Sequence, residues 1–497
     1  MVASGRAPYC LGTMLGQSHL REIVERFLAQ GYLPHFFAVA GFILAFVLVA
    51  RLLSEKRAPA NTFAWLLGII LMPYVGVPLY LLIGGRKLRR IAGRKSRLVA
   101  TLPGASAGPQ PPLAPAVADT VTAAGGGPPV GGNRLKLNVT GEDDFKALEE
   151  HILAARHQIH ITTFILGRDE TGRRLVQLLA ERAAAGVKVR LLLDAFGSFI
   201  SSRGFVDPIR NAGGEVGRFM PVLPLGSRTS ANLRNHRKIG IFDHTTALLD
   251  GRNLAREYMG AAPYRKRWRD LGAVIEGPAA ALLNEVFIAD WCFATRQRSE
   301  TLRAEIPAHV VEPRGRSALQ VVPSGPDVPG DPLYEGIIAM IQEAEQSICI
   351  VTPYFIPDDV LLRSLIVKAR AGRSVTLVLP ARSNHPVTDF ARRYYTRELR
   401  RAGGRILLYP GAMLHAKAMI VDERVALIGS ANFDLRSLFV NFEIGVVAHS
   451  AVDVLALRAW AADLMRECAE EPVEPAGQRR ILGSLVEELS RLLAPLL

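Results

Sequence analysis

The sequence predicts a duplicated α/β fold that follows a pair of membrane-spanning helices. Two observations indicate the duplication: a histidine–lysine–aspartate stretch occurs at 236–253 and again at 415–432, and a similar order of helix and strand patterns precedes each copy. A third observation, two long apolar stretches near the N-terminus, indicates the membrane helices. Because the repeat is well over about 100 residues long, we expect a duplicated domain rather than a solenoid unit.

The composition favours an anionic partner. The chain has 497 residues, enough for two or three domains, and a formal net charge of +14, which suits nucleic acid or an acidic membrane surface. Its four cysteines are scattered, with no CxxC pair and no histidine cluster beside them, so neither a zinc site nor a disulfide framework is expected.

Both apolar stretches lie within or next to residues 31–90, where we expect two transmembrane helices. Residues 27–50 and 58–85 contain no Asp, Glu, Lys or Arg, and each is long enough for a hydrocarbon core of about 30 Å, which needs roughly 20 residues. Basic residues are denser after the second stretch than between the two, which predicts that the large C-terminal part lies in the cytoplasm. A pair of buried core helices is the alternative interpretation.

The remaining boundaries follow from shifts in composition. Pro, Gly and Ala dominate Leu102–Asn133, which predicts a flexible tether between membrane and body. The last segment carries an apolar helical stripe that could pack on the body or lie on a membrane. The expected segments are an N-terminal segment 1–30, the two helices 31–90, a basic and then Pro/Gly-rich linker 91–135, a first half 136–300, a connection 301–332, a second half 333–475 and a C-terminal amphipathic helix 476–497.

Periodicity predicts matching elements in the two halves. Strands that alternate with helices predict a parallel or mixed sheet in each half. The first half is expected to hold a helix over 145–156, a strand over 159–166, a helix over 170–185 and a strand over 187–193. The second is expected to hold a helix over 333–345, a strand over 348–356, a helix over 360–371 and strands over 375–379, 418–421 and 425–428.

Each histidine stretch carries the chemistry of a phosphate site. Residues i and i+2 of a strand share a face, so the histidine and the following lysine point the same way, and the next turn supplies a hydroxyl or an amide. Two copies could bring two histidines together, one to attack phosphorus and one to protonate the leaving oxygen, while the lysines bind the phosphate oxygens. No metal or other cofactor is required. The candidate residues are His236, Lys238, Asp243 and Asn253 in the first copy, and His415, Lys417, Asp422, Ser430 and Asn432 in the second.

The two motif aspartates, Asp243 and Asp422, are among the catalytic candidates, but we expect them to hold the adjacent turn or a nearby basic side chain. The turns differ between the copies. When they are aligned on their asparagines, Asp250 stands where Gly429 does.

These stretches resemble the HxKx4D motifs of the phospholipase D superfamily, and a membrane hairpin followed by two such motifs is similar to bacterial cardiolipin synthases. The chain departs from the family pattern at Asp250, where a glycine is usual, and at 162–163, where two threonines replace a common glutamate. Further segments that resemble the family are 64–82, 186–190 leading to Asp194, 268–270, 321–327, 352–358 and 441–443.

The resemblance implies a phosphatidyl-histidine intermediate. One phosphatidylglycerol would transfer its phosphatidyl group to a histidine and release glycerol, and a hydroxyl of a second phosphatidylglycerol would then attack to give cardiolipin. It also implies that a downstream carboxylate orients each histidine, so that Asp270 partners His236 and Glu443 partners His415, each within its own half. We expect His236 to be the nucleophile and His415 the acid and base, although the pseudo-symmetry leaves the reverse assignment open.

The expected enzyme is therefore integral to the bacterial inner membrane as a multi-pass protein. Its partners would be phosphatidylglycerol and other anionic membrane lipids, not nucleic acid. The alternatives are a phospholipase D-type hydrolase, in which water resolves the same intermediate to phosphatidic acid, a nuclease, and a catalytically inactive lipid-binding scaffold. Two intact histidine sets argue against the scaffold, and the membrane hairpin argues against the nuclease.

Overall fold

The computed structural model describes residues 113–221, 233–306, 311–328 and 330–472, together with short stretches between 39 and 77. The chain divides into two compact units, 1–86 and 87–497. In the first unit, residues 41–44, 46–50 and 66–71 are helical. No helix among the described residues is both long and apolar enough to cross a bilayer. The rest of the predicted hairpin, the first part of the predicted tether and the predicted C-terminal helix lie outside the described residues.

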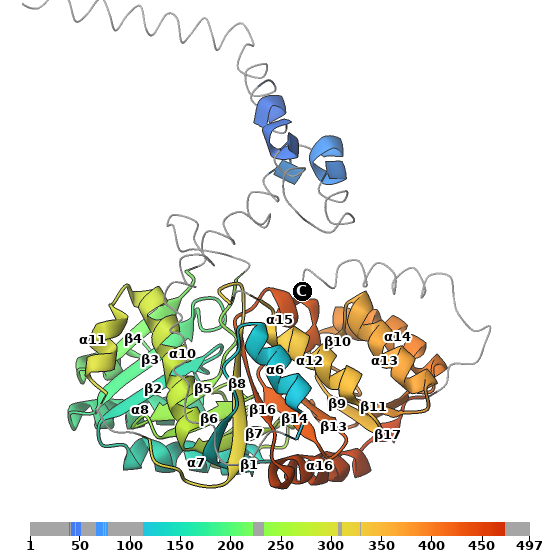
Figure 1. The fold of residues 1–497 in the computed structure, drawn as a ribbon. Helices are drawn as coiled ribbons and strands as arrows, with labels where there is room; N and C mark the ends of the chain where they lie inside the picture. The colour runs from blue at the N-terminus through green and yellow to red at the C-terminus, as the bar shows by residue number, and fades with distance from the viewer. Residues whose placement is uncertain are drawn as a thin grey trace, which may run out of the picture. The chain divides into compact units, whose positions relative to one another are not determined.

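Fifteen strands of the second unit form one mixed sheet, in which the two halves lie side by side (Figure 1). The first half holds β1 (Val130–Asn138), α7 (Gly141–Ala154), β2 (Gln158–Thr163), α8 (Glu170–Ala184), β3 (Lys188–Asp194), α9 (Asp207–Asn211), β4 (Glu215–Phe219), β5 (Ile239–Phe242), β6 (Thr246–Asp250), β7 (Gly272–Glu276), α10 (Pro278–Thr295) and α11 (Ser299–Ala304).

The second half repeats this series with small additions. It holds β8 (Ser317–Ser324), α12 (Pro332–Glu343), β9 (Ser347–Val351), β10 (Phe355–Ile356), α13 (Asp359–Arg370), β11 (Ser374–Pro380), α14 (Pro386–Arg401), β12 (Arg405–Tyr409), β13 (Ala418–Val421), β14 (Val425–Gly429), β15 (Phe433–Asp434), α15 (Leu435–Phe439), β16 (Glu443–Ala448), α16 (Ala451–Arg466) and β17 (Ala469–Glu470).

The strand order confirms the duplication. Read outward from the centre, the first half runs β1-β7-β6-β5-β2-β3-β4, and the second runs β8-β16-β14-β13-β9-β11-β12, with β17 added at its edge. The central strands β1 and β8 pair antiparallel, so the sheet is continuous from one half to the other. Within each half, three strands are parallel (β2, β3 and β4 in the first) and β5, β6 and β7 are antiparallel to their neighbours.

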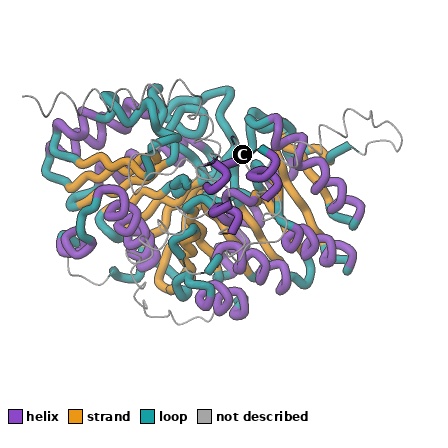
Figure 2. The backbone as a smooth tube through the Cα atoms, turned by 90° about the horizontal axis from the view of Figure 1, so that it is seen from above, coloured by secondary structure: helices purple, strands orange, loops and turns teal. Residues whose placement is uncertain are grey.

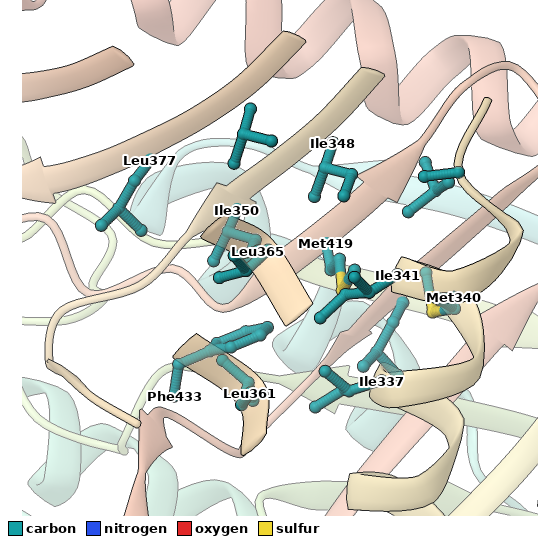
Figure 3. Packing of buried hydrophobic residues seen from close by; sticks show 14 of the residues in the cluster. Ile337, Met340, Ile341, Ile348, Ile350, Leu361, Leu365, Leu377, Met419 and Phe433 are labelled. Carbon is teal, nitrogen blue, oxygen red and sulfur yellow. The ribbon is translucent and has the colours of Figure 1, made fainter. Parts of the chain in front are cut away.

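Helices cover both faces of the sheet (Figure 2). Successive residues of a strand point to opposite faces, and in β7 Ala273 and Ile275 pack in a cluster with α10 and α16, whereas Val274 packs in another with α7 and α8. In the second half, α12 and α13 cover the face opposite α16. Figure 3 shows Ile337 and Leu365 of these helices with sheet residues such as Met419. Burial of these apolar faces fixes the register of the strands whose ends form the site.

The prediction of a flexible tether up to Asn133 is wrong from residue 115 onward. Helix α6 (Pro115–Ala123) begins with proline at its first turn, a favourable position, and buries Val117 and Val121 beside α12. Strand β1 then starts at Val130 and is central in the sheet. Its glycines serve a break in register against β8, where Gly132 has a φ of +78°. The predicted connection 301–332 likewise contains the central strand β8.

Candidate active site

The two histidines lie at the same edge of the sheet, here called the site edge. His236 and His415 precede β5 and β13, and both strands run antiparallel to the strand beside them, β2 and β9. The starts of β5 and β13 therefore lie beside the carboxyl ends of the parallel strands. Loops from these carboxyl ends, and the turns after β6 and β14, complete the surroundings of each histidine.

Main-chain contacts between the halves fix where each histidine lies. The segment before His236 pairs with the start of β16: the His236 amide donates to the Phe442 oxygen at 2.9 Å, and the Phe442 amide donates to the Arg234 oxygen at 2.9 Å. The segment before His415 makes the equivalent contact with Arg269, whose oxygen accepts from the His415 amide at 2.7 Å. Each histidine thus lies against the strand start that carries the other half's carboxylate.

The predicted pairing of histidines and carboxylates within each half is wrong. His236 Nδ1 lies 2.9 and 3.1 Å from the carboxylate oxygens of Glu443, and His415 Nδ1 lies 2.6 Å from Oδ2 of Asp270. The physical reason is the strand order: β6 lies between β5 and β7, and β14 lies between β13 and β16. Within one half the carboxylate is two strands away from the histidine, whereas the contact between halves places it directly opposite.

These contacts set the proton positions on both rings. When Nδ1–H donates to a carboxylate, Nε2 keeps its lone pair and is free to act as a nucleophile or a base. Burial lowers the pKa of both histidines, that of His415 to about 3 with further help from the positive charge of Lys417. Burial opposes ionisation of the two carboxyl groups, but His415 and Lys417 outweigh it at Asp270, and His236 and Lys238 outweigh it at Glu443, so both carboxyl pKa values lie below their ordinary range.

Both motif lysines are buried beside their histidines. Lys238 Nζ donates to the main-chain oxygen of His236 at 2.6 Å. Lys417 Nζ lies 2.6 Å from Nδ1 and 3.2 Å from Nε2 of His415, and it donates to that residue's main-chain oxygen. Burial lowers the pKa of Lys238 to about 7 and that of Lys417 to about 8. Charged groups of the other half also act on each lysine, Glu443 on Lys238 and Asp270 on Lys417. An anion bound between the two lysines would restore both charges.

The turn residues support the site from different positions. Ser430 Oγ donates to Oε2 of Glu443 at 2.5 Å, so it orients the carboxylate of His236. Oδ1 of Asn253 accepts from the Ile165 amide at 3.1 Å, which holds the end of the loop after β2. Asn432 is 7% exposed, and its Oδ1 has no hydrogen-bond partner within the described part of the chain.

The motif aspartates lie away from the histidines, at the opposite ends of β5 and β13. Asp243 accepts three main-chain N–H bonds from residues 156–158 at 2.8 to 2.9 Å. Asp422 accepts three from residues 345–347 at 2.6 to 3.0 Å. Each has a positive φ, 48° and 52°, at the turn that follows its strand. This geometry does not support a catalytic role for Asp243 or Asp422 and instead agrees with the expected turn-holding role.

Comparison with known proteins now identifies the family. A model described as cardiolipin synthase, PLD-like domain matches residues 148–291 and 337–465, and a model described as phospholipase D-nuclease N-terminal matches residues 43–85. The chain belongs to the cardiolipin synthase, PLD-like domain family. The cardiolipin synthase of Geobacillus sp. (strain WCH70) is 34% identical over 91% of this chain and 92% of its own length, and cardiolipin synthase 1 of Bacillus anthracis is 31% identical over 89% and 90%.

A solved structure shows the same fold at low sequence identity. The phosphatidylserine synthase of Haemophilus influenzae aligns with a TM-score of 0.56 at 15% identity, over 73% of this chain and 95% of that one. Because the identity is low, this likeness concerns the fold alone.

Aromatic side chains form part of the site that the motifs did not reveal. The ring of Phe164, just after β2, lies edge-on to His236 with centroids 5.2 Å apart. Tyr258 and Trp268 lie 5.2 and 5.3 Å from the ring of His415. The signal that could have found Phe164 is its place at the carboxyl end of a predicted strand, where binding residues gather in α/β proteins.

Asp194 also belongs to this network, as a positioning residue. It ends β3, and its carboxylate accepts from the amide of Asn235 at 2.9 Å and from the amides of Phe196 and Gly197 at 2.9 and 3.1 Å. It therefore ties the segment that carries His236 to the neighbouring loop.

The buried surroundings of the two sites differ between the halves of this family member. Strand register pairs Asp250 with Gly272 and Gly429 with Gly445, so Asp250 is the counterpart of Gly429. Asp250 joins a buried cluster in which Arg252 Nη1 lies 2.9 Å from Asp144, while Arg252 Nη2 donates to the main-chain oxygen of Asp270. The second half has a small apolar pocket at this place, beside Lys417 and lined in part by Leu333, Gly429 and Ala431.

Burial and the nearby Asp144 carboxylate raise the pKa of Asp250 well above its ordinary value. The other departure from the family pattern is the pair of threonines at 162–163. Thr162 and Thr163 are buried in β2, and Thr163 Oγ1 donates to the Ile165 oxygen at 3.1 Å, so this hydroxyl binds the main chain just after the strand. Among the described residues, no group of three or more His, Cys, Asp or Glu side chains could hold a metal ion.

Proposed function

We propose that this chain is a membrane-bound phosphatidyltransferase that makes cardiolipin and glycerol from two molecules of phosphatidylglycerol. The observation that carries the proposal is the pair of histidines at one edge of the sheet, each hydrogen-bonded through Nδ1 to the other half's carboxylate and each accompanied by a buried lysine. The relatives described above are cardiolipin synthases that align over about nine-tenths of the chain, which supports this substrate class.

In the first step, His236 Nε2 attacks the phosphorus of one phosphatidylglycerol. A P–N bond forms, the bond from phosphorus to the glycerol headgroup breaks, and His415 gives its Nε2 proton to the departing oxygen. Lys238 and Lys417 neutralise the two non-bridging oxygens, whose negative charge is most concentrated in the transition state. We assign the nucleophile to His236 because its side chain is 13% exposed, against 6% for His415.

Protonation of His415 is coupled to substrate binding. The positive charge of Lys417 is one cause of the low pKa of His415. A phosphodiester anion that pairs with this lysine offsets its charge and so raises the pKa of the neighbouring imidazole. The carboxylate of Asp270 then stabilises the imidazolium that donates the proton.

In the second step, His415 Nε2 takes the proton from a glycerol hydroxyl of the second phosphatidylglycerol. The hydroxyl oxygen attacks phosphorus, the P–N bond breaks, and cardiolipin leaves. The aromatic rings of Phe164, Tyr258 and Trp268 reduce the water that reaches the intermediate, which favours an alcohol over water as the acceptor.

Membrane attachment is part of the proposal. The uncharged stretches 27–50 and 58–85 have the length of two spans, and the second overlaps the matched N-terminal family region 43–85. We propose a multi-pass protein of the bacterial inner membrane with its catalytic body in the cytoplasm, where the basic residues after the second stretch would face anionic lipid.

The test is a product analysis. The full chain in detergent is incubated with phosphatidylglycerol, and lipids and free glycerol are quantified for the wild type, His236→Ala, His415→Ala and His157→Ala. His157 is exposed, lies just before the start of β2 on the side of the sheet opposite the site edge, and serves as the control. We expect cardiolipin and equimolar glycerol from the wild type and the control, and neither from the two site variants. Phosphatidic acid as the sole lipid product would favour a hydrolase over a synthase. Retained activity in His236→Ala or His415→Ala would reject the mechanism.

A further inference from the structure

The loop after β3 has the reverse of the polarity expected at a protein surface in water. Phe196, Phe199 and Ile200 are 63%, 51% and 66% exposed. The serines of the same loop face inward: Ser198 Oγ donates to the Phe164 oxygen at 2.8 Å, and Ser201 Oγ donates to the Leu166 oxygen at 2.5 Å. These hydrogen bonds hold the loop in place, so its apolar side chains are directed outward by the structure around them. A contiguous exposed apolar patch of this kind marks an interaction surface.

The loop lies beside the site. It follows Asp194, whose carboxylate binds both the loop amides and the amide of Asn235, next to His236. Phe164, which accepts the serine hydrogen bond, is the residue whose ring contacts His236. The exposed apolar side chains and the nucleophile are therefore tied to the same short stretch of chain.

The second half carries a counterpart at the equivalent place, after β11. At the start of α14, Val387 and Phe390 are 37% and 36% exposed. A cation lies over an aromatic ring in both halves: the Arg393 guanidinium lies 4.8 Å from the centroid of Phe390, and the Arg203 guanidinium lies 4.8 Å from that of Phe199. Both arginines are exposed, whereas the neighbouring Arg392 is 6% exposed and bonded to Asp389. The pseudo-two-fold axis thus repeats an aromatic–arginine pair on either side of the site.

We propose that these two surfaces bind an anionic lipid bilayer. The first consists of Phe196, Phe199, Ile200 and Arg203, and the second of Val387, Phe390 and Arg393. The apolar side chains enter the boundary between headgroups and acyl chains, and Arg203 and Arg393 bind lipid phosphates at the level of the headgroups. The net charge of +14 and the arginine beside each exposed aromatic side chain fit an anionic surface better than an uncharged protein partner. This inference rests on the proposed function, because it gives a lipid a path from the bilayer to the site without passage through water.

The first test is the position of the loop and does not depend on activity. Phe199→Trp is introduced into the full chain, with Val452→Trp as the control. Val452 is 65% exposed on α16, which begins at the carboxyl end of β16 and so lies at the edge of the sheet opposite the site, the lower edge in Figure 1. Each protein is reconstituted into phosphatidylglycerol vesicles whose acyl chains are brominated or plain. The chain's own four tryptophans give the same background in both variants.

We expect bromine to quench the extra emission at position 199 at least twofold and to leave that at position 452 unchanged. Equal quenching at the two positions, or none at either, would overturn docking through these surfaces. Because this readout needs no turnover, it stands even if the product analysis contradicts the proposed function.

The second test separates docking from chemistry. The triple variant Phe196→Ser, Phe199→Ser, Ile200→Ser is compared with the matched control Val452→Ser, Leu455→Ser on two donors, long-chain phosphatidylglycerol in vesicles and a short-chain form below its micelle concentration. We expect the rate of the triple variant to fall at least tenfold on vesicles and less than twofold on the soluble donor. The rate of the control should be unchanged on both donors. An unchanged vesicle rate, or equal losses on both donors, would overturn the proposal. A wild type inactive on both donors would instead reject the proposed function.

Discussion

The pairing between halves predicts that a carboxylate variant behaves like a variant of the other half's histidine. Glu443→Gln keeps the shape of the side chain but removes the charge that faces His236 Nδ1 at 2.9 and 3.1 Å. Asp270→Asn does the same for His415, whose Nδ1 lies 2.6 Å from the carboxylate. Both carboxylates are fully buried, so water cannot replace the lost charge.

The magnitude follows from the hydrogen bond that is weakened. When His236 attacks phosphorus its ring gains positive charge, and a hydrogen bond to a charged group is worth about 1.5–3 kcal/mol. At about 1.36 kcal/mol per tenfold change, Glu443→Gln should slow the first step roughly 10- to 150-fold. Asp270→Asn should slow proton transfer by His415 by a similar factor.

The assay uses a donor whose headgroup leaves without a proton, a phosphatidyl ester of p-nitrophenol, and follows the burst of p-nitrophenol after rapid mixing. Of the two histidine–carboxylate pairs, only the pair that contains the nucleophile is needed for this burst. We expect Glu443→Gln to lose the burst together with His236→Ala, and Asp270→Asn to keep it together with His415→Ala. If His415 were the nucleophile, both pairs would exchange behaviour but remain matched. A match of Glu443→Gln with His415→Ala would refute the pairing.

Three further predictions concern the surroundings of the site. Asp243→Ala or Asp422→Ala removes the acceptor of three main-chain N–H bonds. Each bond is worth about 0.5–1.5 kcal/mol, and less where it is exposed to solvent. Thermal denaturation should show a clearly lower Tm, while kcat per folded molecule changes less than about threefold. Lys238 carries its charge below its pKa of about 7, so kcat/KM for an anionic donor should fall as the pH rises through 7 to 8; Lys238→Arg should move this fall to higher pH, and an unshifted profile would contradict the role of the lysine. Arg252→Ala leaves two carboxyl groups buried without their cation and should cost about 3–5 kcal/mol in urea denaturation. The triple variant Asp144→Leu, Asp250→Gly, Arg252→Ala introduces the residue types that line the second half's pocket, those of Leu333, Gly429 and Ala431. It should be more stable than Arg252→Ala alone.

The sequence was a reliable guide wherever the information is local. A short continuous apolar run predicted the strand over 418–421, which matches β13. Helical spacing predicted a helix over 170–185, and the observed helix α8 is one residue shorter. The repeated histidine stretches predicted that two equivalent sets of residues exist. These features depend on neighbours within a few residues, which the pattern of a single strand or helix records.

The pairing of the site depends on contacts that no local pattern records. His236 and Glu443 are 207 residues apart, and His415 and Asp270 are 145 apart. Proximity along the chain favoured the wrong partner in both cases, because the order in which the strands lie in the sheet cannot be read from the motif. The tether was misread for a related reason: proline and glycine indicate coil by composition, but Pro115 begins a helix and Gly132 allows a strand to break register.

In the proposed mechanism both motif copies are needed. Since each histidine is oriented by the other half's carboxylate, neither half contains a complete catalytic pair, and the continuous sheet through β1 and β8 fixes the two halves as one unit. The halves have nevertheless diverged beneath the site, with the charged cluster around Arg252 in one and an apolar pocket in the other. The cluster contacts the main chain of Asp270, the partner of His415, so the two otherwise equivalent imidazoles lie in different electrostatic surroundings. The proposed mechanism, with one histidine as nucleophile and the other as acid, calls for such a difference.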